Sequence, residues 1–508
     1  MRRSRRRREQ RRHGWRRAGR ILWTAVPIVL GAAVVAAASV VAVNESEDDP
    51  EAASATTGAL VTPVLSARRV PELLTTPVAD RRMQAALAGL MAEVPGASCL
   101  TVNVEGREVF ADEPGAALTP ASVEKLLTAT AALEVIPADF RYRTAVHAVA
   151  QPEGGVVTGN LYLVGRGDPL LMTDDYEQTF RDPPTVSTDL EGFADAVVAA
   201  GVQVVQGGVI GDESRYDNLR AVGAWPARYA GQNVTGPLGA LMFNDGYISV
   251  TPEPPRPETE SEDEPAPNAA PPQQREPAPD PAAHAAKVLT GLLEARGVDV
   301  QGFPATGVAP PGLVEVAGID SPPFEDVVGQ MLLTSDNTTA ELLVKELGAV
   351  AGGGGATVAG VDAMRSTLAT LGLPMEGVAL ADGSGLADVN RVTCRLVQAV
   401  LDRAGPASFI GTALPVAGET GTLAERFEGT TVEGRMRAKT GTLRQSTALA
   451  GFVDAPAGPT LSFAYIVNLT GPDLVNTPDR RLQRQLGEIM VRYPEVPPVT
   501  EVGPQSTP

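Results

Sequence analysis

Histidine and aromatic residues are scarce in this chain of 508 residues. The three histidines, His13, His147 and His284, lie far apart in the sequence, and none belongs to an H-E-x-x-H motif. The sequence therefore holds no H-E-x-x-H zinc site, no Ser-His-Asp triad can be built near the motifs described below, and no metal or other cofactor is expected. Aromatic residues make up 4% of the chain, so we expect cores packed mainly with aliphatic side chains.

Lysine is scarce as well, because four lysines stand against 38 arginines. Only lysine readily loses its proton when buried, so each lysine in such a chain is a candidate for acid–base chemistry. Lys125 follows Ser122 by three residues within TPASVEKLLTATAAL (residues 119–133), a run of strong helix formers. Residues three apart are neighbours on a helix. The amine of Lys125 can therefore accept the proton of Ser122, although a capping serine near a solvated lysine gives the same spacing.

Two further motifs favour the catalytic interpretation. S-D-N at residues 335–337 opens a helix-like run, and K-T-G at residues 439–441 lies in a strand-like pattern. S-x-x-K, S-D-N and K-T-G, in this order, form the signature of penicillin-binding proteins and class A β-lactamases. Since no histidine lies near these motifs, the sequence predicts a serine acyl-transfer enzyme whose general base is a lysine.

The first predicted roles concern proton transfer. Ser122 is the expected nucleophile and Lys125 its general base. Burial and the nearby charge of Lys439 are expected to lower the pKa of Lys125, which keeps the amine neutral. Ser335 is expected to relay the proton to the leaving amine, and Asn337 to hold Lys125 together with a substrate amide.

The remaining roles concern substrate binding along the K-T-G segment. Lys439 and the Thr440 hydroxyl are expected to hold a substrate carboxylate, with Gly441 next to them in the binding segment. The backbone N–H groups of Ser122 and Thr442 are expected to form an oxyanion hole for the negative charge that develops on the attacked carbonyl oxygen.

Several segments outside the three motifs support one family resemblance: LYLVGRGDPLL, GDESRY, GPLGALMFNDG, and DGSGL at residues 382–386. With them, the chain resembles the low-molecular-mass penicillin-binding proteins of the D-alanyl-D-alanine carboxypeptidase/endopeptidase type (peptidase family S13), in an actinobacterial-looking version. The resemblance covers roughly residues 70–495. It implies an α/β (α+β) catalytic domain like that of β-lactamases and transpeptidases, with extra domains inserted after the S-x-x-K helix.

The resemblance also implies a substrate and an inhibitor. Such enzymes remove the terminal D-alanine of peptidoglycan stem peptides that end in D-Ala-D-Ala, or cut D-alanyl cross-links, and β-lactam antibiotics inhibit them covalently. Ser384 and Leu386 match the family and are expected to line the site, unless the segment is only a glycine-rich turn. The family often continues DGSGL with Ser-Arg in a stretch that helps shape the pocket for the third substrate residue, whereas Ala387-Asp388 follow here.

Two other functions are compatible with the motifs. A class A β-lactamase needs a glutamate that holds the deacylating water, typically in an E-x-x-L-N loop, and residues 338–438 contain no such motif. A non-catalytic β-lactam sensor that binds the cell wall would tolerate a broken motif, and none of the three is broken. The peptidase interpretation is therefore preferred.

The N-terminal residues predict a membrane anchor. Residues 1–21 hold eleven arginines and one glutamate, residues 22–43 hold no charge, and residues 44–70 form an acidic, then Ala/Thr/Pro-rich tether. As a helix, residues 22–43 span about 33 Å, which matches the hydrocarbon core of a bilayer. The positive-inside rule places the N-terminus in the cytoplasm and the body outside the cell. The alternative is a cleaved signal peptide and a secreted protein; anionic lipid head groups explain the arginines better than nucleic acid does.

The body of the chain predicts one discontinuous domain with an insert. Strand patterns near both chain ends, flanked by terminal helical patterns, predict a single sheet in a catalytic domain of residues 71–140 and 315–495. The stretch between the first two motifs is too long for a loop, so residues 141–314 are predicted to form an inserted, mostly β domain. Residues 252–283 contain eleven prolines and eight acidic residues and are predicted to be disordered, as is the tail 496–508.

The two cysteines allow two interpretations. Cys99 lies in a predicted hairpin strand and Cys394 in a predicted helix, both in the part expected outside the cell. A disulfide between them fits an oxidising compartment. Two separate buried thiols are the alternative, and neither cysteine has a neighbour that indicates catalysis.

Overall fold

The structure is a computed structural model of the 508-residue chain. It describes residues 71–180, 183–252, 274–456, 458–471, 475 and 477–495. The predicted basic segment, membrane span, tether and C-terminal tail lie outside the described residues. No helix within the described part of the chain is long and apolar enough to cross a membrane.

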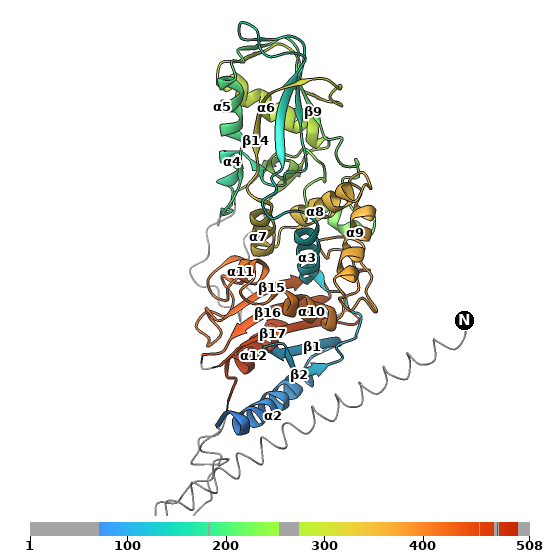
Figure 1. Ribbon diagram of the computed structural model, residues 1–508, viewed down its shortest axis with the longest axis vertical. Helices are drawn as coiled ribbons and strands as arrows, with labels where there is room; N and C mark the ends of the chain where they lie inside the picture. The colour runs from blue at the N-terminus through green and yellow to red at the C-terminus, as the bar shows by residue number, and fades with distance from the viewer. Residues whose placement is uncertain are drawn as a thin grey trace, which may run out of the picture. The chain divides into compact units, whose positions relative to one another are not determined.

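The catalytic domain is built on a five-stranded antiparallel sheet from both ends of the chain (Figure 1). Its strands, in spatial order, are β15 (Met436–Thr442), β16 (Ser446–Asp454), β17 (Thr460–Asn468), β1 (Ala97–Val104) and β2 (Arg107–Asp112). The first described strand therefore pairs with the last one, with Ala97 opposite Asn468. This arrangement confirms the predicted single sheet.

Helices cover both faces of this sheet. α2 (Pro71–Met91) and α12 (Thr477–Val491) share one apolar core with it, and α3 (Lys125–Val135) and α10 (Cys394–Ala404) share the other. Side chains alternate along a strand, so Leu449 packs on the first core and Ala450 on the second. Burial on both faces explains why the sequence STALAGFV is an almost continuous apolar run.

A helical layer lies on the far side of α3. α3 is in contact with α7, α8 and α9, and Figure 1 shows it between these helices and the sheet. The helices of this layer and the short turns near them are α7 (Phe324–Thr334), α8 (Asn337–Val350), α9 (Thr357–Thr370), α11 (Phe409–Ala413), η1 (Ala121–Glu124) and η4 (Gly421–Leu423).

The insert domain has its own mixed sheet, in the order β13-β9-β5-β3-β14. Its strands are β3 (Arg143–Ala148), β5 (Leu161–Val164), β9 (Val209–Asp212), β13 (Ala305–Thr306) and β14 (Val314–Asp320). Smaller elements of this domain are β4 (Val156–Val157), β6 (Leu171–Met172), α4 (Asp174–Glu177), β7 (Thr188–Asp189), β8 (Val204–Val205), η2 (Ala227–Gly231), η3 (Asn244–Gly246), β10 (Tyr247–Val250), β11 (Arg275–Pro277) and β12 (Asp299–Val300).

Two predictions about the insert domain were wrong in detail. The boundary at residues 314/315 cuts into β14, whose Asp320 pairs with Arg143 of β3, so the insert domain extends from residue 143 to residue 320. The domain is also not mostly β, because α5 (Leu190–Ala199) and α6 (Pro281–Ala295) share one core with its sheet. The buried residues of α6 follow helical spacing, but the proline-rich sequence before them obscured that pattern.

The predicted C-terminal boundary of the disordered loop, residue 283, was placed too late in the sequence. Residues 253–273 are outside the description, whereas β11 pairs with β10 and α6 already begins at Pro281. The Asp280 side chain accepts a hydrogen bond from the Ala283 N–H and so caps the helix. An acidic cap followed by proline is a typical helix start. Proline and acidic residues are also typical of disordered segments, so Asp280 and Pro281 were counted with the predicted disordered loop.

The two cysteines form a disulfide. Cys99 of β1 is bonded to Cys394 at the first position of α10, and their Cα atoms are 6.0 Å apart. Of the two alternatives, the disulfide is therefore the one present in the structure. It joins segments 295 residues apart in sequence, and a cross-link over such a long loop strongly restricts the unfolded chain.

Candidate active site

Ser122 lies in the η1 turn that leads directly into α3. In a 3₁₀ turn, residues three apart lie one above the other, and the Lys125 Nζ is 2.9 Å from the Ser122 Oγ. Ala121 has a positive φ of 49°, so the chain bends sharply just before the serine. The predicted contact between serine and lysine is present, although the serine precedes the α-helix itself.

Lys125 is fully buried, and its amine has three neighbours. Besides the Ser122 Oγ, Nζ lies 2.7 Å from the Asn337 Oδ1 and 2.9 Å from the Ser384 carbonyl oxygen. These two oxygens can only accept hydrogen bonds, so they take both N–H groups of a neutral amine. The amine lone pair is then left for the hydroxyl proton of Ser122.

Burial moves Lys125 toward the neutral amine, whereas the acidic groups around it favour the ammonium form. Burial lowers the pKa of Lys125 from its ordinary value to about 8, while the carboxylate of Asp336 and other acidic groups oppose the shift. The pKa of Lys439 is also lowered, first by burial and then by the charge of Lys125. Two buried amines that repel each other's charge cannot easily both be protonated.

Asn337 is held in one orientation by the insert domain. Its Nδ2 donates a hydrogen bond of 2.8 Å to the Val234 carbonyl, which directs Oδ1 toward Lys125. The Gly236 N–H donates to the neighbouring Thr338 hydroxyl at 3.0 Å. The start of α8, which carries S-D-N, therefore rests on backbone groups of the insert domain.

Ser335 and Lys439 meet on the other side of the site. Ser335 has left-handed backbone angles (φ 60°, ψ 32°) where α7 ends, and this bend presents its hydroxyl to β15. The Lys439 Nζ donates to the Ser335 Oγ at 2.7 Å and to the Thr440 carbonyl at 3.0 Å. Lys439 is fully buried, so its charge is poorly screened by water.

The K-T-G segment of β15 runs beside the serine turn. A Cβ atom on Gly441 would lie 2.8 Å from the Pro120 carbonyl and 3.1 Å from the Ser122 N, so only glycine allows this approach. Thr440 and Thr442 flank this glycine, and the Thr442 side chain is exposed. The Thr440 hydroxyl lies 2.9 Å from that of Thr422 in η4. Thr422 was not predicted, since no pattern in its sequence surroundings indicates a site.

The DGSGL segment supports the site from behind. Ser384 contacts Lys125 through its carbonyl rather than its hydroxyl, and Leu386 is 5% exposed. A Cβ atom on Gly385 would lie 2.0 Å from the Ala121 carbonyl, so the segment packs directly on the serine turn. Both predicted residues are close to the site, but the Ser384 side chain is buried and does not line an open surface.

Asp382 organises this segment. Its carboxylate accepts hydrogen bonds from the Gly385 and Ala387 N–H groups and the Asn390 side chain. The fourth donor is the indole of Trp225 in the insert domain, at 2.7 Å. Sequence reasoning missed Trp225, because a tryptophan more than 150 positions from its partner gives no local signal.

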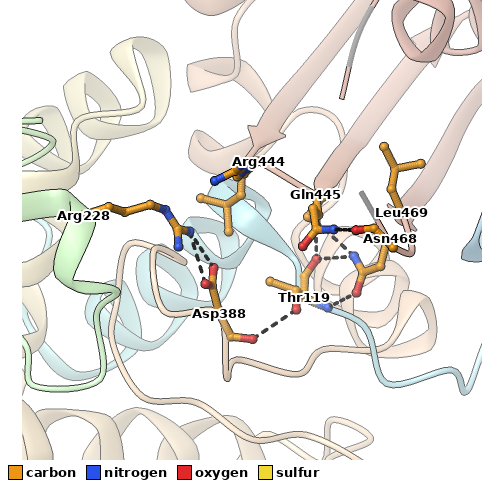
Figure 2. A pocket seen from close by; sticks show the side chains of 10 residues that line it. Thr119, Arg228, Asp388, Arg444, Gln445, Asn468 and Leu469 are labelled. Carbon is orange, nitrogen blue, oxygen red and sulfur yellow. Dashed lines mark hydrogen bonds and ion pairs between the residues drawn. The ribbon is translucent and has the colours of Figure 1, made fainter. Parts of the chain in front are cut away.

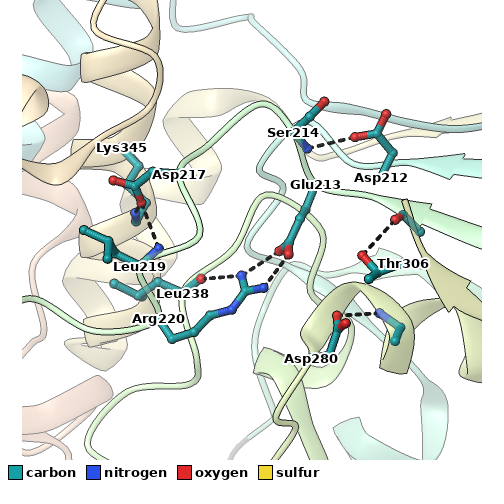
Figure 3. Close-up of polar contacts among 12 residues, drawn as sticks. Asp212, Glu213, Ser214, Asp217, Leu219, Arg220, Leu238, Asp280, Thr306 and Lys345 are labelled. Atoms are coloured by element: carbon teal, nitrogen blue, oxygen red, sulfur yellow. Dashed lines mark hydrogen bonds and ion pairs between the residues drawn. The ribbon is translucent and has the colours of Figure 1, made fainter. Parts of the chain in front are cut away.

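Lys345, another of the four lysines, has a structural role. It is fully buried in α8 and forms an ion pair with Asp217 of the insert domain (Figure 3). On the next residue of α8, Glu346 binds Arg215. The insert domain therefore holds α8 by two adjacent ion pairs. The scarcity of lysine made all four lysines candidates for acid–base chemistry, so it could not distinguish the structural Lys345 from the catalytic lysines.

An open cavity of about 410 Å³ adjoins the serine turn and the end of β15 (Figure 2). Asp388, one of the two residues that replace the Ser-Arg often found in the family, forms an ion pair with Arg228 of the insert domain at 3.1 Å. The other lining residues are Thr119, Leu443, Arg444, Gln445, Ser446, Asn468, Leu469 and Gly471. The cavity therefore presents both signs of charge next to the segment that leads into the serine turn.

The fold and the site together define a serine acyl-transfer enzyme of the penicillin-binding class. A model of the D-Ala-D-Ala carboxypeptidase 3 (S13) family matches residues 83–277 and 266–485. A D-alanyl-D-alanine carboxypeptidase of Actinomadura sp. strain R39 is 32% identical over 433 residues, which cover 72% of this chain and 76% of that protein. The carboxypeptidase DacB of Mycolicibacterium smegmatis is 30% identical over 423 residues, or 79% of this chain and 84% of that protein.

A solved structure gives the same fold. Penicillin binding protein 4 (dacB) of Haemophilus influenzae aligns with a TM-score of 0.64 at 19% identity, over 80% of this chain and 98% of that chain. That protein has also been solved in complex with a β-lactam, with a TM-score of 0.58. The chain belongs to the D-Ala-D-Ala carboxypeptidase 3 (S13) family of serine peptidases, which confirms the predicted family and activity.

Proposed function

We propose that the chain removes terminal D-alanine from peptidoglycan stem peptides through an acyl-enzyme on Ser122. The observation that carries this mechanism is the environment of Lys125. Its amine is buried, and Asn337 and Ser384 supply acceptor oxygens for its N–H groups. A neutral amine in this environment is directed at the Ser122 hydroxyl.

In the first step, the Ser122 oxygen attacks the carbonyl of the penultimate D-alanine, and its proton moves to Lys125. The N–H groups of Ser122 and Thr442 stabilise the oxyanion. Lys439 and the Thr440 hydroxyl hold the carboxylate of the terminal D-alanine. When the peptide bond breaks, Ser335 relays to the leaving amine the proton that Lys125 took from Ser122, so that Lys125 is neutral again, while Lys439 keeps its charge and its hydrogen bond to Ser335.

Water then attacks the acyl-enzyme and releases the shortened peptide. We infer that the cavity in Figure 2 receives the side chain of the third stem residue, as the family resemblance implies. The Arg228–Asp388 pair suits a side chain with both an amino and a carboxylate group. β-Lactams are expected to acylate Ser122 in place of the peptide.

We also propose that the catalytic body is outside the cell, held by a helix at residues 22–43. The charge pattern of the N-terminal residues supports this location, and the Cys99–Cys394 disulfide fits an oxidising compartment. Membrane fractionation combined with N-terminal sequencing of the mature protein tests the proposal. A secreted protein that begins after residue 36 would contradict it.

Purified muropeptides test the reaction itself. The wild-type protein and a Ser122→Ala variant are incubated with uncross-linked pentapeptides and, separately, with cross-linked dimers, and products are identified by mass spectrometry. Loss of one D-alanine, only with the wild-type protein, is expected. Cleavage of dimers into monomers would show endopeptidase activity, and an intact pentapeptide would contradict the proposal.

A further inference from the structure

Two buried carboxyl groups beside Lys125 have no role in the reaction above. Glu124 precedes Lys125 in the chain, and within the described residues neither of its carboxyl oxygens has a hydrogen-bond partner. Glu341 of α8 is also fully buried. One of its oxygens accepts hydrogen bonds, whereas the other has no partner in the described part of the chain.

Glu341 is connected to the catalytic amine through one residue. Its Oε1 accepts hydrogen bonds from the Gly383 N–H at 3.1 Å and the Ser384 N–H at 2.8 Å. The Ser384 carbonyl in turn accepts from the Lys125 Nζ at 2.9 Å. The Thr128 hydroxyl donates to the Gly383 carbonyl at 2.7 Å and fixes the same backbone from α3. Glu341 thus determines where the Ser384 carbonyl lies.

The bonding of Glu341 fits a neutral acid as well as a carboxylate. Both N–H groups bind the same oxygen, which leaves the second oxygen free to carry a proton. Burial raises the pKa of Glu341 to about 8, and the charge of Asp382 acts in the same direction. Burial lowers the pKa of Lys125 to about 8. The acid and the base therefore exchange protons with solvent over the same pH range.

Charged and titratable groups surround this pair on every side. Those that act on Lys125 are Glu124 in η1, Asp336 before α8, Glu341 in α8 and Asp382 in the DGSGL segment. The charge of Lys125 in turn lowers the pKa of Lys439 in β15. Burial raises the pKa of Glu124 well above its ordinary value. Asp382 is held by four donors, from Gly385, Ala387, Asn390 and Trp225.

We propose that Glu341 is a positioning residue for the general base. As a neutral acid it holds the Ser384 carbonyl against the Lys125 amine, and on losing its proton it stabilises the ammonium form and opposes acylation. This inference rests on the proposed role of Lys125 as the base.

The sign of the effect follows from the charges. At low pH, Lys125 is an ammonium group and Glu341 is neutral. Loss of one proton gives either the neutral amine, which is active, or the ammonium–carboxylate pair, which is inactive. A glutamine at position 341 still accepts both N–H bonds but cannot form the inactive pair. The acylation rate falls at low pH as Lys125 becomes protonated, and we call this part of the pH–rate profile the acid limb. In the glutamine variant the acid limb should move to lower pH.

The test measures the acylation rate with a fluorescent penicillin across about pH 5 to 10, a range that covers both titrations. Glu341→Gln is expected to shift the acid limb down by about one pH unit, the smallest shift usual for a close opposite charge. Glu346→Gln is the matched control, because this buried glutamate on the same helix binds Arg215 instead. It should leave the limb in place.

Lys125→Arg is measured in parallel. If it acylates normally, the assignment of the base is wrong and the inference falls with it. If Lys125→Arg is inactive and a folded Glu341→Gln variant keeps the wild-type limb, only the role of Glu341 is refuted. Should Glu341→Gln not fold, a Glu124→Gln variant with ¹³C-labelled glutamate carboxyls is titrated by NMR, because Glu124 also has a raised pKa and would give a similar signal in the wild-type protein. A carboxyl that titrates near pH 8 is expected, and the absence of any that titrates well above the ordinary glutamate range would overturn the proposal.

Discussion

The catalytic domain and the insert domain contribute to the active site in different ways. The side chains assigned to nucleophilic attack and proton transfer all come from the catalytic domain, whereas Arg228 of the insert domain lines the cavity proposed for the substrate side chain. The insert domain contributes supports, which are the Val234 carbonyl on Asn337, the Trp225 indole on Asp382 and the Asp217 carboxylate on Lys345. An insert that is far from the motifs in sequence is therefore part of the active-site framework.

This division predicts two kinds of damage. A change in the catalytic domain should remove a step of the reaction while the protein stays folded. A change in the insert domain should loosen the position of a catalytic group, or lower stability, while each step stays available. Substitutions on the two sides can therefore be ranked by their effect on the acylation rate.

The largest effect is expected for Ser122→Ala. The variant lacks the nucleophile, so covalent labelling by a fluorescent penicillin should be abolished. The missing hydroxyl contacts only the Lys125 amine among the described groups, so the thermal unfolding curve should barely change. Labelling of a folded variant at the wild-type level would show that another residue is acylated.

Lys125→Arg should have the next largest effect. The positive charge remains, but a guanidinium group cannot act as a base near neutral pH. General-base catalysis is typically worth about 10²–10⁴-fold, and acylation should fall by at least that amount. The rate is measured by stopped-flow mixing with a chromogenic penicillin. A variant with more than about a tenth of the wild-type rate would mean that another group takes the proton.

These two residues were predictable from sequence because their interaction is local. Three positions along a helical turn bring a serine and a lysine together whatever surrounds them, and S-D-N and K-T-G are equally short patterns. The sheet was also predictable, since alternating and continuous apolar runs reflect burial on one or both faces. The Cys99–Cys394 disulfide could be proposed but not decided, because the sequence also allows two separate buried thiols.

The supports were not predictable for a physical reason. Val234 acts through a backbone carbonyl that every residue possesses, so its side chain carries no signal. Glu341 has the sequence surroundings of any acidic residue on a helix, and only folding shows that it is buried. The end of the insert domain was misplaced because β14 pairs with β3 more than 150 positions earlier, and such long-range pairing leaves no local trace.

Trp225→Phe should have an intermediate effect. It keeps the apolar ring but removes one of four donors to the buried Asp382 carboxylate. A hydrogen bond to a charged group contributes about 1.5–3 kcal/mol. If about half of that loss reaches the transition state through a displaced DGSGL segment, acylation falls about 4- to 12-fold.

A matched variant distinguishes an effect on the position of the active-site segment from an effect on the stability of the fold. Tyr176→Phe also removes a donor to an aspartate, because its hydroxyl binds Asp245 at 2.8 Å within the insert domain. It should lower the unfolding free energy but leave the acylation rate unchanged. Equal rates for both variants would mean that Trp225 does not position the site.

Asp217→Asn should have the smallest effect on rate but a clear effect on stability. It leaves the fully buried Lys345 ammonium without its counter-charge. Breaking a buried ion pair from one side costs about 3–5 kcal/mol, and the lower end applies here because Asp217 is a quarter exposed. Since Lys345 contacts the insert domain rather than the amine of Lys125, the folded variant should acylate at nearly the wild-type rate.

The double variant Asp217→Asn/Lys345→Met sharpens this test. It replaces the buried charge with an apolar side chain of similar length, and such replacements are often neutral or stabilising. Urea denaturation should show the stability lost in the single variant largely restored, because the cost arises from the unpaired ammonium. If the double variant is instead as unstable as the single one, α8 needs the ion pair itself to stay bound to the insert domain. A loss of acylation would then accompany the loss of stability. This contact of the insert domain would in that case affect the reaction rate as well as stability.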